Sequence, residues 1–195
     1  MTHFALTALV PGHIQDTEGF LDSLLAPYSE NLQVDPYRRY VDNFWMDQEF
    51  RKSGSLTAAE GDPDYVDQYV AAWNKRYPGE DELYLETETR QAYHLSTYNP
   101  SSKWDWWEIG GRYAGEWPSG NFSCPQDLLV LLDQGDDGVP TLAMLTPAGQ
   151  WHERGRAGWW GTVHDVKERA DWVSEYRRVL ESHLDCRAVL LDLHI

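Results

Sequence analysis

Apolar and polar residues alternate at both ends of the chain. In residues 3–10 every even position is apolar, and in residues 187–195 the odd positions from 189 onward are apolar. A period of two residues is typical of a β-strand that turns one face toward a core. Each end of the chain is therefore predicted to form a strand. The second face of the C-terminal strand is partly polar and carries Asp192 and His194.

The segment after the first strand has apolar residues at helical spacing. A short helix is predicted over residues 20–26, where a proline follows. Aspartate–proline pairs, which are typical of helix starts, precede two further predicted helices over residues 36–52 and 63–77. Both helices have acidic outer faces, and their aromatic stripes are predicted to pack in a core.

Strand patterns return in the second half of the chain. Residues 83–90 alternate, and 92–98 can continue the same sheet. The short runs 141–145 and 150–153 are separated by a turn sequence, which predicts a hairpin. A last helix is predicted to begin with Asp165 as its cap and to end near residue 184.

Strands at both termini, with helices and strands between them, predict an α+β fold with a mainly antiparallel sheet. We expect the first and last strands to be adjacent, and a ferredoxin-like core is the favoured arrangement. The chain, 1–195, is expected to be a single domain, because domains commonly contain about 150 residues. The acidic segment 30–82 is then a helical elaboration of that core.

Two segments, 104–117 and 151–160, hold seven of the ten tryptophans and combine them with glycine and arginine. Tryptophan offers a flat stacking face, and arginine offers a planar fork for phosphate or carboxylate. The segments predict a pocket for a small, nucleotide-like anion, although no phosphate-loop motif is present. The alternative is that the tryptophans fill the core. The candidate ligand-binding residues are Trp104, Asp105, Trp107, Arg112, Trp151, His152, Glu153, Arg154, Arg156 and Trp160.

A second candidate site lies on the terminal strands. Asp192 and His194 share a face of the last strand, and His3 approaches them if the first strand runs antiparallel beside it. Two histidines and a carboxylate suit a metal or a general base that a carboxylate orients. The alternative is a histidine–aspartate hydrogen bond with a structural role. His3, Asp192 and His194 are the candidate catalytic residues.

Other chemistry has weaker support in the sequence. His152-Glu153 and His164-Asp165 contain metal-ligating residue types, but their spacing matches no metal motif, so the metal and any cofactor stay unknown. A nucleophile motif is also lacking. The two cysteines, Cys124 and Cys186, have no CxxC spacing and are expected to be lone buried thiols.

The net charge of −16 excludes several partners. Direct nucleic-acid binding is not expected, because phosphate contacts need an excess of lysine and arginine. Docking on anionic lipid is not expected for the same reason, and no apolar run is long enough for a membrane span. The short apolar start lacks the basic region of a signal peptide, so a cytoplasmic location is expected. An acidic surface can bind a basic host protein or mimic DNA.

Three motifs resemble a known family. Residues 99–115 fit the signature NP-x-x-KWDW-x-x-x-GGRW-x-G, residues 146–160 fit a TPdGxWHExGxMGW block, and the last four residues, 192–195, fit a DCHI ending. These are signatures of a family of uncharacterised proteins from actinobacteria and their phages. The start, Thr2-His3-Phe4, is also similar, whereas residues 30–90 show no clear match.

The resemblance implies an actinobacterial or phage source and one shared site, but no activity. This chain departs from the family pattern at Tyr113, where the family tends to have Trp, and at Ala157, where it tends to have Met. Leu193 replaces the cysteine of the DCHI ending, which removes any thiol role at that position.

Three functions follow from these observations. The leading hypothesis is a phage-type protein that binds a small anionic ligand, for example a nucleotide used as a defence signal. The second is a metal- or histidine-dependent hydrolase of a phosphoester or glycosidic ligand. The third is an acidic inhibitor of a basic protein, or a DNA mimic. The oligomeric state does not follow from the sequence.

Overall fold

The computed structural model describes residues 2–79, 81–135, 139–158 and 162–195. The chain divides into two compact units, and each is described by itself. Unit 1 joins the chain up to Leu32 with Asn99–Ile195, and unit 2 is the intervening segment Gln33–Tyr98. The strands form mainly antiparallel sheets, and helices lie between strands along the chain, which confirms the predicted α+β class.

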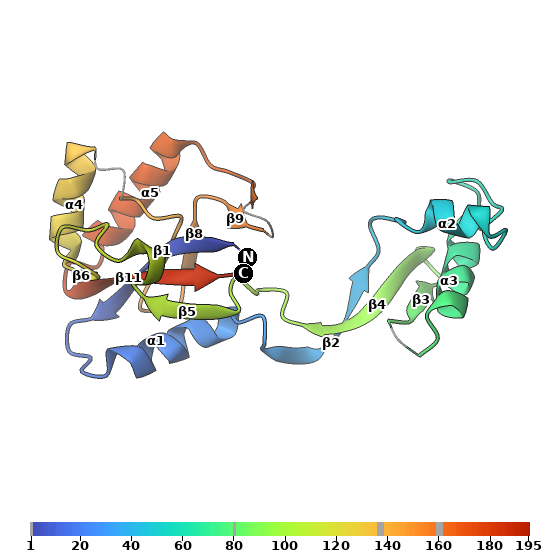
Figure 1. The fold of residues 1–195 in the computed structure, drawn as a ribbon, viewed down its shortest axis with the longest axis horizontal. Helices are drawn as coiled ribbons and strands as arrows, with labels where there is room; N and C mark the ends of the chain where they lie inside the picture. The colour runs from blue at the N-terminus through green and yellow to red at the C-terminus, as the bar shows by residue number, and fades with distance from the viewer. Residues whose placement is uncertain (1, 80, 136–138, 159–161) are drawn as a thin grey trace. The chain divides into compact units, whose positions relative to one another are not determined.

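Unit 1 is built on a six-stranded sheet with the order β5-β11-β1-β7-β8, in which β6 also pairs with β11 (Figure 1). Neighbouring strands are antiparallel except for β1 and β7, which run parallel. The hairpin predicted from residues 141–153 is confirmed as β7 and β8. The strands are β1 (His3–Pro11), β5 (Trp106–Ile109), β6 (Phe122–Ser123), β7 (Ala143–Leu145), β8 (Trp151–Glu153) and β11 (Cys186–His194).

The two terminal strands, β1 and β11, pair antiparallel along their whole length, as predicted. The register places His3 opposite His194 and Pro11 opposite Cys186. Both strands are buried on both faces, because apolar side chains occupy nearly every position and not only alternate ones. A strand of this kind needs a layer on each side of the sheet.

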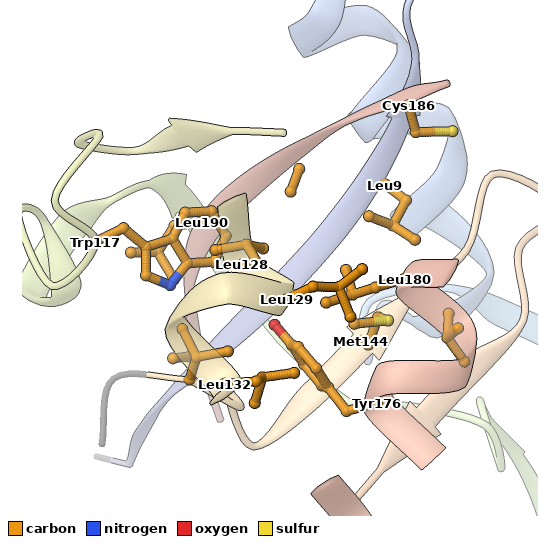
Figure 2. Packing of buried hydrophobic residues seen from close by; sticks show 14 of the residues in the cluster. Leu9, Trp117, Leu128, Leu129, Leu132, Met144, Tyr176, Leu180, Cys186 and Leu190 are labelled. Atoms are coloured by element: carbon orange, nitrogen blue, oxygen red, sulfur yellow. The ribbon is translucent and has the colours of Figure 1, made fainter. Parts of the chain in front are cut away.

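Helices cover both faces of the sheet in unit 1. Helix α1 (Thr17–Leu25), which a short 3-10 turn at Ala26–Tyr28 follows, packs on the even-numbered side chains of β1. Helices α4 (Pro125–Gln134) and α5 (Arg169–Glu181) pack on the odd-numbered side chains (Figure 2). A ferredoxin-like core has its helices on one face, so this detail of the prediction does not hold.

The start of α5 also differs from the prediction. The helix begins at Arg169 and its cap position is Glu168, so the predicted cap at Asp165 is wrong. The preceding residues form a small two-stranded sheet from β9 (Arg156–Ala157) and β10 (Val163–His164). Because β10 pairs with β9 in extended conformation, the helix cannot begin there.

Unit 2 contains a three-stranded antiparallel sheet and two helices (Figure 1). Strand β4 (Gln91–Tyr98) lies between β2 (Gln33–Tyr40) and β3 (Leu83–Glu86). Helix α3 (Tyr65–Arg76) confirms the prediction over residues 63–77 and packs its aromatic face into the core of the unit.

The helix predicted over residues 36–52 is wrong for its first half. Residues 33–40 form the edge strand β2, and only the short helix α2 (Asp47–Lys52) is helical. The strand pairing shifts register between Gln33 and Tyr37, around Pro36. Proline is tolerated at such irregular positions of edge strands. The aspartate–proline pair therefore lies in an irregular strand here and does not start a helix.

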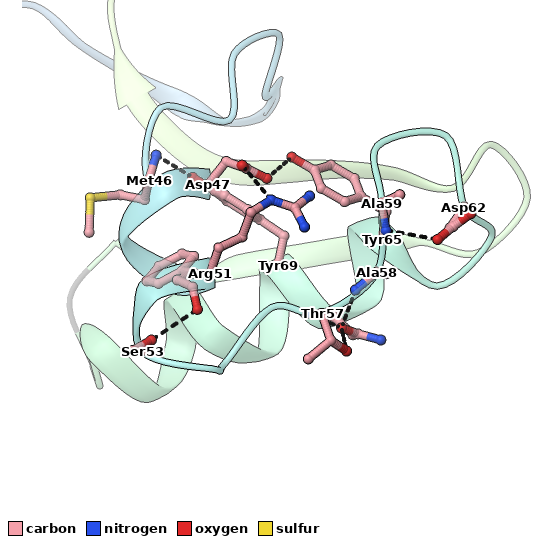
Figure 3. A network of polar contacts seen from close by, with 12 residues as sticks. Met46, Asp47, Arg51, Ser53, Thr57, Ala58, Ala59, Asp62, Tyr65 and Tyr69 are labelled. Atoms are coloured by element: carbon pink, nitrogen blue, oxygen red, sulfur yellow. Dashed lines mark hydrogen bonds and ion pairs between the residues drawn. The ribbon is translucent and has the colours of Figure 1, made fainter.

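Polar contacts hold α2 against α3 (Figure 3). The Asp47 carboxylate accepts hydrogen bonds from Arg51 Nε at 2.8 Å and from the Tyr65 hydroxyl at 2.8 Å. Burial, together with the Asp47 carboxylate, raises the pKa of Tyr65 well above its usual value. The Met46 backbone N–H donates to the Tyr69 hydroxyl at 3.3 Å. These contacts fix the loop that precedes α2.

Candidate functional site

The structure brings His3, Asp192 and His194 together at one end of the unit 1 sheet. His3 Nδ1 donates to Asp192 Oδ1 at 2.9 Å, although 189 residues separate them in the chain. The Asp192 side chain is only 1% exposed. A buried carboxylate needs hydrogen-bond donors to offset its lost hydration, and His3 is one of them.

A second carboxylate holds the other histidine. His194 Nδ1 lies 2.5 Å from Asp105 Oδ1, and the Asp105 backbone N–H donates to the His194 carbonyl at 2.9 Å. The His3 and His194 rings meet edge to face with their centroids 5.0 Å apart. His194 Nε2 is buried and has no hydrogen-bond partner among the described residues. The sequence placed Asp105 in the other candidate site.

A glycine turn closes around Asp192. Gly110 and Gly111 both have positive φ, and they lead into the 3-10 turn Gly111–Tyr113. The Arg112 backbone N–H donates to Asp192 Oδ2 at 2.9 Å. A Cβ atom at Gly111 would lie 2.5 Å from the Asp192 side chain, so only glycine fits there. The Arg112 side chain itself is exposed.

Trp104 and Trp107 are half-buried and pack against the core, which favours the alternative interpretation for these two residues. Both rings contact the apolar cluster on the α1 face of the sheet, and Trp104 Nε1 donates to the Leu25 carbonyl at 3.1 Å. The predicted pocket therefore does not combine these two rings with Arg112.

An open cavity of about 500 Å³ lies beside the edge strand β8. The described residues of its wall combine the Trp151 indole with side chains of both charges. Trp151, His152, Glu153 and Arg156, four of the predicted ligand-binding residues, line it. The remaining lining residues are Lys103, Gly155, Asp165, Lys167 and Glu175.

One ion pair orients the aromatic wall of this cavity. Lys103 Nζ lies 2.8 Å and 3.0 Å from the two Glu153 oxygens. Trp151 Nε1 also donates to Glu153, at 2.8 Å, and its ring packs against Tyr28 with 4.9 Å between centroids. The Trp151 indole is therefore held in place before any ligand arrives.

Glu175, on α5, forms hydrogen bonds with two other residues that line the cavity. It accepts from His152 Nδ1 at 2.9 Å and from Lys167 Nζ at 2.7 Å. Burial raises the pKa of Glu175, but the hydrogen bonds from Lys167 and His152 outweigh burial and leave that pKa below its usual value. Glu175 therefore stays ionised at neutral pH and holds Lys167 at the cavity.

Two cavity residues are less firmly held. Arg156 lies 3.8 Å from Asp165, and the side chains are 63% and 84% exposed. An exposed pair at this distance leaves the guanidinium available to a ligand. Arg154, in contrast, is not one of the lining residues, and its Nε donates to the Lys167 carbonyl at 3.5 Å.

The remaining predictions for this region have different outcomes. Trp160 lies outside the described residues. Within the described part of the chain, no group of three or more histidine, cysteine or acidic side chains is arranged to hold a metal ion. The His152-Glu153 and His164-Asp165 set is therefore not arranged as a metal site. Lys103, Lys167 and Glu175 were missed. Lys103 belongs to the NP-x-x-KWDW motif within residues 99–115, but the position of the other two depends on how α5 packs.

A comparison with protein-family models, with curated proteins and with solved structures finds no match to this chain. Of the helices in the described residues, none combines the length and apolar character needed to cross a membrane.

Proposed function

We propose that this protein binds a small anion with an aromatic ring, of the nucleotide type, in the cavity beside β8. The observation that supports this proposal is the joint presence of Trp151, Arg156 and two lysines around one cavity of about 500 Å³. Cavities of this size suit small-molecule ligands. The binding site is smaller than the sequence suggested, because it lacks Trp104, Trp107 and Arg112.

Each wall has a separate task in this proposal. Trp151 offers its fixed ring for stacking on a base. Arg156 exchanges its distant partner Asp165 for the phosphate of the ligand, since a guanidinium can bind phosphate through two parallel hydrogen bonds. Glu153 and Glu175 keep the lysines in position. Because these carboxylates balance the lysine charges, the cavity favours ligands of low charge over polyphosphates.

Isothermal titration calorimetry with a panel of mononucleotides, dinucleotides and cyclic nucleotides tests the proposal. We expect saturable binding of at least one member, weakened about tenfold in Arg156→Ala, which corresponds to about 1.4 kcal/mol. Arg178→Ala, an exposed position of α5, is the matched control and should bind as the unmodified protein does. If no member of the panel binds, or if Arg156→Ala binds equally well, the proposal is wrong.

Membership of the actinobacterial and phage family, and a counter-defence role, accompany this proposal and rest on the sequence motifs alone. A nucleotide that serves as a host defence signal is the ligand such a role would require. Co-expression of the protein with a nucleotide-signalling defence system, followed by phage plaque counts, tests the role. Arg156→Ala should lose any protection of the phage.

A hydrolase that uses His3 and His194 is the second candidate. It is favoured by one observation: each ring is held through Nδ1 by its own aspartate, which leaves both Nε2 atoms for proton transfer. Such a pair can supply a general acid and a general base.

The buried position of His194 Nε2 requires a local opening before substrate reaches it. Turnover of bis-(p-nitrophenyl) phosphate or of p-nitrophenyl glycosides that disappears in His194→Ala supports this candidate, and full turnover in that variant eliminates it. Activity that survives exhaustive chelation argues for the histidines without a metal.

A further inference from the structure

Unit 2 has an exposed tryptophan between two cavities. Trp45 precedes α2 and is 64% exposed, and its ring stands edge to face with Trp73 at 5.8 Å. Cavities of about 410 Å³ and about 350 Å³ share Asp42, Asn43 and Trp45 in their walls. Tryptophan is one of the residue types that are enriched among the residues carrying most of the binding energy at protein interfaces.

The charged side chains around Trp45 are mainly acidic, and most of these acids have no ion-pair partner among the described residues. Asp42 and Asp81 line the first cavity, and Glu60 lines the second. None of these three carboxylates forms an ion pair among the described residues. Asp47, in contrast, is already bound by Arg51 and Tyr65 (Figure 3).

Two further groups line the first cavity. His94 Nδ1 is buried and has no hydrogen-bond partner within the described part of the chain. It can accept a hydrogen bond from an N–H donor of a ligand. Among the described lining residues of these two cavities, Arg39 is the single lysine or arginine. Across the whole of unit 2, thirteen acidic residues stand against seven basic ones.

We propose that the Trp45 surface, defined by Asp42, Trp45, Glu60, Asp81 and His94, binds arginine or lysine side chains of a basic peptide segment in a partner protein. A guanidinium stacks on the exposed indole face, where the ring quadrupole attracts a cation. The unpaired carboxylates then accept its N–H donors in charge-assisted hydrogen bonds. This surface lies entirely in unit 2 and is independent of the cavity beside β8.

Titration with acetyl-tetra-arginine amide at 150 mM salt tests the proposal. The titration is followed by NMR with the tryptophans of the protein labelled with ¹⁵N. Single substitutions of Trp45 and Trp73 assign their indole N–H signals. We expect both signals to shift and saturate, and Trp45→Ala to weaken binding at least tenfold although the net charge is unchanged. Trp106→Ala, which removes an exposed ring from unit 1, should bind the peptide as the unmodified protein does.

Charge variants determine the sign of the preferred ligand. Asp42→Asn should weaken peptide binding about threefold, whereas Glu88→Gln, an exposed acid outside both cavity walls, should have no effect. Arg39→Gln should tighten binding. Equal affinity in Trp45→Ala, or weaker binding in Arg39→Gln, overturns the proposal, because the first denies the aromatic anchor and the second denies the charge complementarity. Arg156→Ala should leave peptide binding unchanged.

Discussion

The imidazole rings of His3 and His194 stand edge to face across the central strand pair of unit 1, and each is bonded to a different aspartate. Asp192 belongs to β11 itself, whereas Asp105 directly precedes β5. One polar layer therefore ties together β1, β11 and the segment that enters the edge strand. It lies on the face of the sheet that α4 and α5 cover, beyond the apolar cluster.

Removal of the charge at Asp192 should destabilise unit 1. The buried carboxylate accepts hydrogen bonds from His3 and from the Arg112 backbone N–H. Asp192→Asn replaces one acceptor oxygen with a donor, so we expect a loss of about 2 kcal/mol in the free energy of unfolding. Urea denaturation measures it. Asp22→Asn, an exposed position on α1, is the control, and an equal loss in both variants would contradict the structural role of Asp192.

Substitution of Gly111 should cost more than substitution of Gly115, although both have positive φ. Gly111→Ala combines backbone strain with a collision against Asp192, and we expect it to lower the free energy of unfolding by about 3 kcal/mol. A Cβ at Gly115 meets nothing within 4 Å, so Gly115→Ala should lose only about 1 kcal/mol. Chemical denaturation of the two variants separates the cost of the collision from the cost of the backbone strain. Equal losses in the free energy of unfolding would contradict the collision with Asp192.

The two cysteines should differ in reactivity. Cys124 is exposed, contrary to the expectation of two buried thiols, and Cys186 is buried. Burial, with the neighbouring Asp185 charge, raises the pKa of Cys186 to about 11. At pH 8 only about one Cys186 thiol in a thousand is then ionised. Ellman's reagent should modify one thiol rapidly and the second only after denaturation. In Cys124→Ser the rapid phase should vanish, and a rapid phase that persists would show that Cys186 is accessible.

Stability of unit 1 should fall in alkaline solution because of Tyr176. Burial raises the pKa of this phenol to about 12, although hydrogen bonds with Thr7 and Thr141 oppose the shift. Between the unfolded value of 10 and about 12, the unfolded chain loses this proton while the folded protein keeps it. Tyr176 therefore makes its full contribution to the free energy of unfolding below pH 10, and this contribution is lost as the pH rises through 12. Urea midpoints at pH 8, 10 and 11 should decline less in Tyr176→Phe, and a decline of equal steepness would exclude Tyr176 as the cause.

Sequence patterns predicted the terminal strand pair because apolar residues recur at every second position over a long stretch at each end of the chain. The same alternation placed His3 near His194, since antiparallel register brings the two ends of the chain together. The Asp105 contact could not be predicted in this way, because it depends on the register of the four-residue strand β5. Short strands carry too little pattern to determine their partner.

The composition of the tryptophan-rich segments did not indicate which tryptophans pack against the core and which line a cavity. Trp104 and Trp151 have similar neighbours in the sequence, yet Trp104 packs under α1 while Trp151 lines a cavity. The difference arises from tertiary packing, because Lys167, which precedes α5, and Glu175, on α5, complete the cavity beside Trp151. For the same reason the sequence did not indicate Glu175, which reaches the cavity from α5.

The insertion of unit 2 into unit 1 has a consequence for biosynthesis. Unit 2 is one continuous segment and can fold as soon as residue 98 has left the ribosome. Unit 1 cannot do so, because β1 is made first but pairs with β7 and β11, which are made more than 130 residues later. The first strand must therefore wait unpaired until β7 and β11 have been made. Because its sequence is apolar, a chaperone that covers exposed apolar segments would protect it during this interval.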